Sequence, residues 1–249
     1  MQQYNRESMF GLIKECGEII KNPNRNDINI QEKEGPANFV TSYDLLVQNK
    51  LRDGLQQLFP KAKFIGEEGQ QETYTEKGEF FIVDPIDGTT NFIKDYQMSC
   101  ISVAYVVDGK VDFAVIYNPY LNELFWAKRG EGAYCNDKII HVSEHDLSNG
   151  IVLFGTSPYD MDLAKKSFEM AYKYFCQALD IRRSGSAALD LCAIAAGRAE
   201  LYFELILSPW DYAAGMLIVE EAGGIVTTLD GEKPVLNKRC SILARNKKI

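Results

Sequence analysis

Helices and strands alternate through the second half of this 249-residue chain, and this alternation restricts the fold more than any other feature of the sequence. Short apolar runs predict the strands, and longer periodic stretches between them predict the helices. We expect strands at 151–155, 178–181, 200–204, 225–229 and 240–244, and helices at 161–175, 186–196 and 210–222. Such an order of elements is typical of a layered α/β architecture.

The first half has a different order of elements. Two amphipathic helices are expected, one over 5–20 and one that begins at the capping residue Thr41 or Ser42 and ends before Pro60. Residues 21–36 lie between these helices and predict a polar loop or an irregular hairpin. Strands are expected at 64–66, 80–83, 99–107, 111–117 and 122–127, with Asp108-Gly109 as a hairpin turn.

An α+β fold of two closely packed subdomains accommodates both halves, and the chain length fits this arrangement. We expect an N-terminal α+β subdomain over residues 1–145 and a C-terminal α/β subdomain over residues 146–249. The sequence between them contains no repeat, low-complexity tract or flexible linker. The two subdomains are therefore expected to pack directly against each other.

The balance of charges argues against some classes of partner. The chain has 27 Lys and Arg against 35 Asp and Glu, for a net charge of −8. An acidic protein repels a phosphate backbone, so we expect no nucleic-acid partner. Solvated surface acids are the commoner explanation of such a charge. A sharper hypothesis is that some of the carboxylates converge on one site that binds cations.

The sequence predicts a soluble cytoplasmic protein with no membrane partner. Residues 1–7 are polar and have no apolar signal core, and no apolar run is long enough to cross a bilayer. The cysteines form no CxxC pair, which argues against a thiolate zinc site and favours buried free thiols in a reducing compartment. They are Cys16, Cys100, Cys135, Cys176, Cys192 and Cys240.

Three acidic groups beside turns carry the chemical information: residues 66–68 (GEE), 84–92 (DPIDGTTNF) and 209–215 (PWDYAAG). In the second group a buried apolar strand ends at Asp84, and Asp87 follows three residues later, so both carboxylates can point into one hollow. Two like charges a few ångströms apart are costly unless a cation neutralises them. Oxygen ligands without His or Cys favour a hard cation, and Mg²⁺ fits best.

The loop after Asp87 also offers hydrogen-bond donors to an anion. Gly88 lets the backbone approach a ligand closely, and Thr89-Thr90 can open a helical turn whose N–H groups face a phosphate. His141 and His145 lie in a polar segment and are interpreted as surface residues. A single Asp-Pro, Glu-Glu or Asp-Gly is more often a loop start, a solvated pair or a turn. The combination of these motifs with a buried strand favours a functional site.

Residues 84–92, 210–215 and 66–68 resemble the motifs of the inositol monophosphatase family, in the family's order. The resemblance covers nearly the whole chain, although the family often has a further helix after the last strand. It implies a layered αβαβα sandwich shared with the fructose-1,6-bisphosphatases. It also implies up to three Mg²⁺ ions in each active site, sensitivity to lithium, and a homodimer.

By motif position, the resemblance assigns the ligands of the three Mg²⁺ ions. Glu67, Asp84 and the carbonyl of Ile86 would hold the first ion, and Asp84, Asp87 and Asp211 would hold the second. Glu67 alone would hold the third, with water completing its coordination. The metal-binding loops would thus lie in the N-terminal subdomain, with Asp211 reaching them from the C-terminal one.

The resemblance also assigns residues that would assist the chemistry. Thr89 would orient the attacking water together with Asp44, the aspartate at the start of the second helix. Glu68 would be a catalytic partner behind the metal ligands. Lys33, in the polar loop, matches a family lysine near the third metal.

The substrate side is implied by the segment 182–188 and by Glu204. Glu204 would accept hydrogen bonds from inositol hydroxyls. From the residues alone, the segment 185–188 equally fits a tightly packed helix N-terminus, and Glu204 fits a surface position. The residues that would contact the substrate are Asp87, Gly88, Thr89, Gly185, Ser186, Ala187, Glu204 and Asp211.

The sequence therefore predicts hydrolysis of a small phosphomonoester by metal-activated water, with inositol monophosphate as the first candidate. Fructose-1,6-bisphosphate, histidinol phosphate and NADP are alternative substrates. Adenosine 3′,5′-bisphosphate is disfavoured, because its phosphatases tend to have Lys-Glu-Phe where this chain has Thr90-Asn91-Phe92. Outside catalysis, the alternatives are a regulatory binding protein on the same fold and a protein with a structural divalent cation.

Overall fold

The computed structural model describes residues 3–33, 39–69, 74–158 and 160–249. Its first sheet has seven strands in the order β3-β4-β5-β6-β7-β8-β9, of which only β3 and β4 pair in parallel. These strands are β3 (Lys63–Gly66), β4 (Glu79–Asp87), β5 (Cys100–Val107), β6 (Lys110–Asn118), β7 (Glu123–Lys128), β8 (Ala133–Cys135) and β9 (Lys138–Ile140).

The second sheet has five strands in the order β11-β10-β12-β14-β13. Strand β10 pairs in parallel with β11 and β12, whereas β14 pairs antiparallel with β12 and β13. The strands are β10 (Ile151–Phe154), β11 (Asp180–Arg182), β12 (Leu201–Leu207), β13 (Ile225–Thr227) and β14 (Cys240–Arg245). A separate small hairpin joins β1 (Ile30–Glu32) to β2 (Phe39–Thr41).

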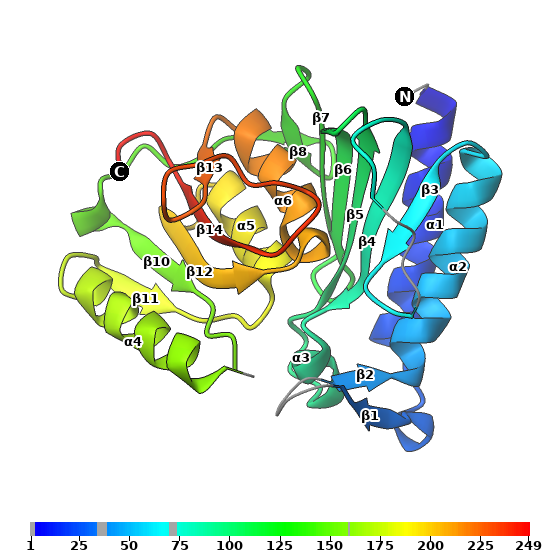
Figure 1. The fold of residues 1–249 in the computed structure, drawn as a ribbon, viewed down its shortest axis with the longest axis horizontal. Helices are drawn as coiled ribbons and strands as arrows, with labels where there is room; N and C mark the ends of the chain where they lie inside the picture. The colour runs from blue at the N-terminus through cyan, green and yellow to red at the C-terminus, as the bar shows by residue number, and fades with distance from the viewer. Residues whose placement is uncertain (1–2, 34–38, 70–73, 159) are drawn as a thin grey trace.

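Helices separate and cover the two sheets, as Figure 1 shows. Helices α1 (Gln3–Lys21) and α2 (Ser42–Leu58) lie on the outer face of the seven-stranded sheet. Helices α5 (Ala187–Ala195) and α6 (Pro209–Glu221) lie between the sheets, and α4 (Met161–Phe175) covers the far face of the second sheet. The layers run α, β, α, β, α, which confirms the predicted α+β layered sandwich.

Buried apolar side chains fill the spaces between these layers. One cluster joins α1 and α2 to the outer face of the first sheet and includes Met9, Leu51 and Phe81. A larger cluster packs α5 and α6 against both sheets, with Leu191 and Leu217 wholly buried in it. Helix α6 thus packs against β5 and β6 although it lies far along the chain. The division at residues 145 and 146 stays a prediction.

Helices α2 and α6 each carry, in their first turn, an aspartate that accepts a hydrogen bond from the N–H of the N-cap residue. In α2 the Thr41 N–H donates to Asp44 Oδ2 at 2.7 Å, and the Asp44 N–H donates to the Thr41 hydroxyl at 3.4 Å. In α6 the Ser208 N–H donates to Asp211 Oδ2 at 2.7 Å, and Pro209 starts the helix. These reciprocal hydrogen bonds satisfy N–H groups that a helix end leaves free, and they fix where Asp44 and Asp211 point.

Several local predictions are corrected by the structure. Strand β4 continues through Asp87 instead of ending at Asp84, with a register shift between the two residues. The hairpin of β8 and β9 was not expected. The cysteines are free, but only Cys16, Cys100 and Cys192 are buried: Cys135 and Cys240 are partly buried, and Cys176 is exposed. None of the described helices is long and apolar enough to span a membrane.

Candidate active site

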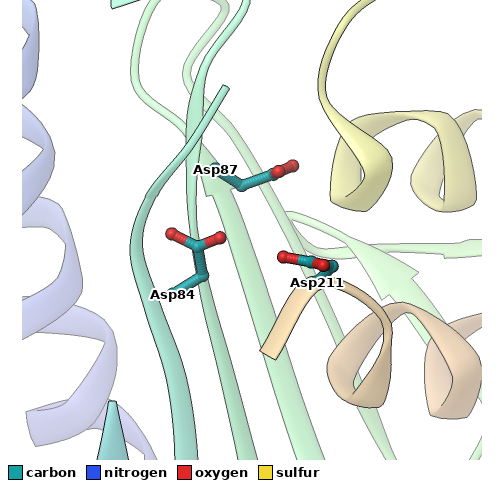
Figure 2. Close-up of side chains that lie close together, drawn as sticks. All are labelled: Asp84, Asp87 and Asp211. Carbon is teal, nitrogen blue, oxygen red and sulfur yellow. The ribbon is translucent and has the colours of Figure 1, made fainter. Parts of the chain in front are cut away.

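Three carboxylates from two distant parts of the chain meet at one point. Asp84 and Asp87 lie on the last residues of β4, and Asp211 lies in the first turn of α6 (Figure 2). One carboxylate oxygen from each residue lies within 4.8 Å of those from the other two. The register shift in β4 matters here, because it allows residues 84 and 87 to present their side chains to the same hollow.

Burial makes this arrangement costly without a cation. Burial, followed by the nearby charges of Glu67 and Asp87, raises the pKa of Asp84 well above its usual range. The pKa of Asp211 is raised in the same way, and that of Asp87 is raised to about 6. None of the three carboxylates forms an ion pair within the part of the chain that the structure describes. Three ionised oxygen ligands of this kind fit a hard divalent cation.

Without a divalent cation, the protein should lose stability as the pH rises. The three carboxyl groups have higher pKa values in the folded protein than in the unfolded chain, so the folded protein retains their protons to higher pH. Their contribution to stability is complete below about pH 4 and is lost as the pH rises through the folded pKa, which is about 6 for Asp87. A change of about 1 kcal/mol shifts the Tm by about 2–4 °C.

We therefore expect the Tm in EDTA to be several degrees lower at pH 8 than at pH 5. Thermal unfolding followed by circular dichroism measures this difference. Added Mg²⁺ should raise the Tm more at pH 8 than at pH 5, since more of the carboxylates are then ionised. A Tm in EDTA that rises with pH would contradict this account of the three carboxylates.

Glu67 and Glu68 follow β3 and share one cationic partner. Lys33 Nζ lies 2.8 Å from Glu67 Oε1 and also contacts Glu68 Oε1. Burial, and then the charge of Glu67, raises the pKa of Glu68 to about 7. Glu67 lines the same cavity as Asp87 and Asp211. Glu68 instead faces a separate groove beside Gln48, so it lies behind this cavity.

Asp44 and Thr89 are brought together as the sequence predicts. The Thr89 hydroxyl lies 3.4 Å from Asp44 Oδ1 and 3.2 Å from the carbonyl oxygen of Ile86. Asp44 is wholly buried, and burial raises its pKa to about 6 despite hydrogen bonds from Thr41. Thr89 begins the short helix α3 (Thr89–Ile93), as expected. Its hydroxyl can therefore donate to a carboxylate while its oxygen accepts a hydrogen bond.

Gly88 precedes this helix in a conformation that requires glycine. Its φ of 89° lies in the left-handed region, and a Cβ atom there would come within 2.9 Å of the Met98 carbonyl oxygen. Glycine at residue 88 is therefore required by the packing of this turn against the Met98 carbonyl, and its close approach to a ligand stays a prediction. Asn91 Nδ2 donates to the carbonyls of Met98 at 2.6 Å and Ser184 at 3.0 Å, and so fastens α3 to the segment before α5.

A cavity of about 410 Å³ opens beside the carboxylates. All the residues predicted to contact substrate line it: Asp87, Gly88, Thr89, Gly185, Ser186, Ala187, Glu204 and Asp211. Among the other predicted site residues that the structure describes, Glu67 lines the cavity, whereas Lys33, Asp44, Glu68, Asp84 and Ile86 do not. Arg183 also lines it and lies within the predicted segment 182–188, whereas Asp190, which lines it too, was not predicted.

Two substrate-side predictions become more specific. Glu204 is not a surface residue, because it is partly buried and accepts hydrogen bonds from Tyr202 Oη at 2.7 Å and from the Ser157 N–H at 3.4 Å. Burial raises its pKa to about 7. The Ser186 hydroxyl donates to Asp87 Oδ2 and caps α5 by accepting from the Leu189 N–H. The hydroxyl of Ser186 is therefore engaged by Asp87 instead of facing the cavity freely.

Residues 185–188 form the start of α5, as the helix-cap interpretation predicts, and three of them line the cavity, whereas their contact with substrate stays a prediction. Ser186 is the N-cap residue of α5, and the Ala188 N–H donates to Asp87 Oδ2 at 2.8 Å. The start of α5 thus holds one oxygen of Asp87. His141 and His145 are exposed, as predicted, and neither lines the cavity.

Residues 2–249 match the sequence model of the "Inositol monophosphatase family". The chain belongs to this family. Its relatives include the "Nus factor SuhB" of Salmonella typhimurium, 38% identical over 220 residues that cover 88% of this chain and 82% of that protein. "Inositol monophosphatase 1" of Bos taurus is 32% identical over 246 residues, covering 95% of this chain and 87% of that protein.

Solved structures of the inositol monophosphatase family share the fold described above. An IMPase of Thermotoga maritima superposes with a TM-score of 0.89 and 30% sequence identity. The superposition covers 100% of this chain and 94% of the other. The predicted inositol monophosphatase fold is therefore confirmed.

Proposed function

We propose that this chain is a Mg²⁺-dependent phosphatase that hydrolyses a small polyol monophosphate, with inositol monophosphate as the first substrate to test. The observation that supports it is the meeting of Asp84, Asp87 and Asp211 beside a polar cavity, with the Thr89–Asp44 pair at its edge. Membership of a phosphatase family supports the reaction class.

The donor set fits Mg²⁺, because it consists of carboxylates and a carbonyl with no nitrogen or sulfur ligand. Glu67, Asp84, Asp87, Asp211 and the Ile86 carbonyl would hold up to three ions. When bound, Mg²⁺ would neutralise the phosphate and lower the pKa of a bound water. Lys33 Nζ contacts Glu67 through Oε1, so Glu67 can bind an ion through its other oxygen or by sharing Oε1.

Thr89 and Asp44 would direct the attacking water. The Thr89 hydroxyl donates towards Asp44 Oδ1, which leaves a lone pair on the threonine oxygen to accept a proton from water. Asp44 Oδ2 already accepts hydrogen bonds from the Thr41 N–H and hydroxyl, so Oδ1 is the oxygen turned towards Thr89. Because the pKa of Asp44 is about 6, the carboxylate is mainly ionised at neutral pH and can accept a proton.

The lining of the cavity favours a substrate with hydroxyl groups and a single phosphate. Arg183 is its only cationic side chain among the described residues, whereas five carboxylates line it: Glu67, Asp87, Asp190, Glu204 and Asp211. Carboxylates not needed for a metal accept hydrogen bonds from hydroxyl groups but repel a second phosphate. Fructose-1,6-bisphosphate and NADP carry further phosphate groups, so we rank them below inositol monophosphate.

A phosphate-release assay tests the proposal. Inositol 1-phosphate, fructose-1,6-bisphosphate, histidinol phosphate, NADP and adenosine 3′,5′-bisphosphate would each be incubated with the protein, with Mg²⁺ and with EDTA. We expect Mg²⁺-dependent release that is fastest from inositol 1-phosphate. No release from any of the five substrates with Mg²⁺ would refute the proposed function.

A regulatory binding role is the second candidate, and the names of several relatives favour it, since they are called Nus factors. On this hypothesis the chain binds a macromolecule, and the prediction that it binds no nucleic acid would be wrong if that macromolecule is RNA or DNA. That prediction is tested by fluorescence polarisation with labelled RNA and DNA. The predicted homodimer and cytoplasmic location are likewise proposals, and sedimentation velocity measures the first of them.

Lithium should inhibit the enzyme at millimolar concentration. Li⁺ is close to Mg²⁺ in its preference for oxygen ligands but carries half the charge, so its presence in one of the ion sites would leave the phosphate incompletely neutralised. Initial rates at fixed Mg²⁺ and increasing LiCl measure the effect, with NaCl at equal ionic strength as the control. Equal rates in LiCl and NaCl would rule out lithium sensitivity.

A further inference from the structure

The side-chain amide of Gln48 forms two hydrogen bonds with the backbone of Glu68, one as donor and one as acceptor. Gln48 Nε2 donates to the Glu68 carbonyl oxygen at 2.8 Å, and the Glu68 N–H donates to Gln48 Oε1 at 2.9 Å. Gln48 lies in the middle of α2 and is 2% exposed, so water does not compete for these hydrogen bonds. A buried primary amide can satisfy a donor and an acceptor at once, which an apolar side chain of similar length cannot.

Gly66 provides a second observation at the same place. A Cβ atom at residue 66 would lie 2.1 Å from Gln48 Oε1 and 2.6 Å from its Cδ. Its φ is not among the positive values in the chain, so the backbone conformation does not require glycine. Gly66 is therefore needed for space, and the space it leaves is filled by the Gln48 amide.

Hydrogen bonds hold the backbone at Glu67 and at the residue that follows it. On one side, the Glu67 N–H donates to the Val83 carbonyl oxygen of β4 at 3.1 Å, immediately before Asp84. On the other side, the backbone of Glu68 is held by Gln48. Gln48 follows Asp44 by four residues on α2, so the two side chains lie on the same face of this helix. That face turns the Asp44 carboxylate, the proposed proton acceptor, and the Gln48 amide towards the candidate active site.

We propose that Gln48 is a positioning residue that sets the Glu67 carboxylate in its place as a metal ligand, and that Gly66 is glycine to admit it. Gln48 has no part in the chemistry itself, because it does not line the cavity. The inference rests on the proposed function, which gives Glu67 its role towards Mg²⁺. Residues that orient metal ligands from behind typically change metal affinity by about 10–100-fold when replaced.

The test compares Gln48→Met, which keeps the side-chain length but removes both hydrogen bonds, with Val47→Ala. Val47 is the neighbouring, wholly buried residue of α2 and belongs to the apolar cluster between α1, α2 and the first sheet, so its truncation should lower the Tm without touching the site. The affinity for Mg²⁺ is measured by isothermal titration calorimetry, and the Tm by circular dichroism in EDTA. We expect Gln48→Met to weaken Mg²⁺ binding by about 10-fold and Val47→Ala to change it by less than about 2-fold.

A second set of variants tests the fit between Gly66 and Gln48. Gly66→Ala should weaken Mg²⁺ binding in the wild-type background, because the new methyl group displaces the Gln48 amide. In a Gln48→Ala background the same change should have little further effect, since the nearest remaining contact is the edge of the Phe64 ring at 2.9 Å, which can shift. Equal losses from Gly66→Ala in both backgrounds would overturn the proposed fit.

The outcomes separate this inference from the proposed function. If wild type binds Mg²⁺ but releases no phosphate, the phosphatase proposal fails, while calorimetry still decides the role of Gln48. If wild type is an active phosphatase and Gln48→Met binds Mg²⁺ as tightly as wild type does, the positioning role is refuted and the phosphatase proposal stands. If wild type binds no Mg²⁺, both are refuted.

Discussion

Replacing Asp84 by Asn should lower kcat/KM for the phosphate ester by about 10³-fold or more while the protein stays folded. Asp84 is the proposed ligand shared by two metal ions, and a neutral amide oxygen holds Mg²⁺ poorly. The charge stabilisation that a metal supplies is worth several kcal/mol, and each 1.36 kcal/mol corresponds to a tenfold change in rate.

The same substitution should leave the metal-free protein at least as stable as wild type at pH 8. It removes one of three neighbouring carboxylates that repel one another. The Asn side-chain oxygen can still accept the hydrogen bond that the Ile86 N–H donates to Asp84 Oδ1 at 3.0 Å in the wild type. Initial rates with Mg²⁺ and the Tm in EDTA measure the two effects. Glu200→Gln is the matched control, because Glu200 is a buried acid outside the cavity. Mg²⁺-dependent activity equal to wild type in Asp84→Asn would contradict the proposed role.

Replacing Thr89 by Ala should lower kcat by about 10²-fold or more and change the affinity for Mg²⁺ little. The hydroxyl, 3.4 Å from Asp44 Oδ1, is proposed to orient the attacking water, and a positioned proton acceptor contributes about 10²–10⁴-fold. No metal ligand is lost, since the Ile86 carbonyl oxygen, 3.2 Å from the hydroxyl, belongs to the main chain and is retained in the variant.

Thr89→Ser is the conservative control for this prediction, because serine keeps the hydroxyl and should retain most of the activity. Steady-state kinetics give kcat, and calorimetry gives the affinity for Mg²⁺. Should Thr89→Ala weaken Mg²⁺ binding as much as it lowers kcat, Thr89 would be a structural support of the metal loop and would not direct water.

The sequence predicted best where local chemistry decides the structure. Helix α4 spans 161–175 as expected, because its apolar spacing is periodic and Asp160 caps its start. The start of α2 was narrowed to two residues, and Thr41 is the cap. Strands β5 to β7 were predicted to within a residue or two, since the Asp108-Gly109 turn and the long apolar runs mark their ends.

Elements that depend on distant partners were missed or misplaced. The hairpin of β8 (Ala133–Cys135) and β9 (Lys138–Ile140) has only three residues in each strand, too few to show an alternating pattern. Strand β4 runs past Pro85 because β5 pairs with it as far as Asp87. The antiparallel direction of β14 is likewise set by its pairing with β12, which no local signal in the sequence reports.

In the candidate site, too, the sequence motifs predicted some features, whereas contacts that depend on distant partners were missed. The motifs predicted that Asp211 lies beside Asp84 and Asp87, although it follows them by more than a hundred positions. The structure brings the three carboxylates together. The contact of Ser186 with Asp87 and that of Gln48 with Glu68 were not predicted. Both depend on the direction of one polar side chain, and a lone glutamine within a helix carries no signal of its partner.

The central claim is that Asp84, Asp87 and Asp211 meet to hold a divalent cation. Anomalous diffraction from crystals grown with Mn²⁺, an oxygen-preferring ion with a usable anomalous signal, measures this most directly. We expect a strong anomalous peak within bonding distance of oxygens from all three carboxylates. An anomalous map with no peak between them, in crystals that contain Mn²⁺ elsewhere, would contradict it.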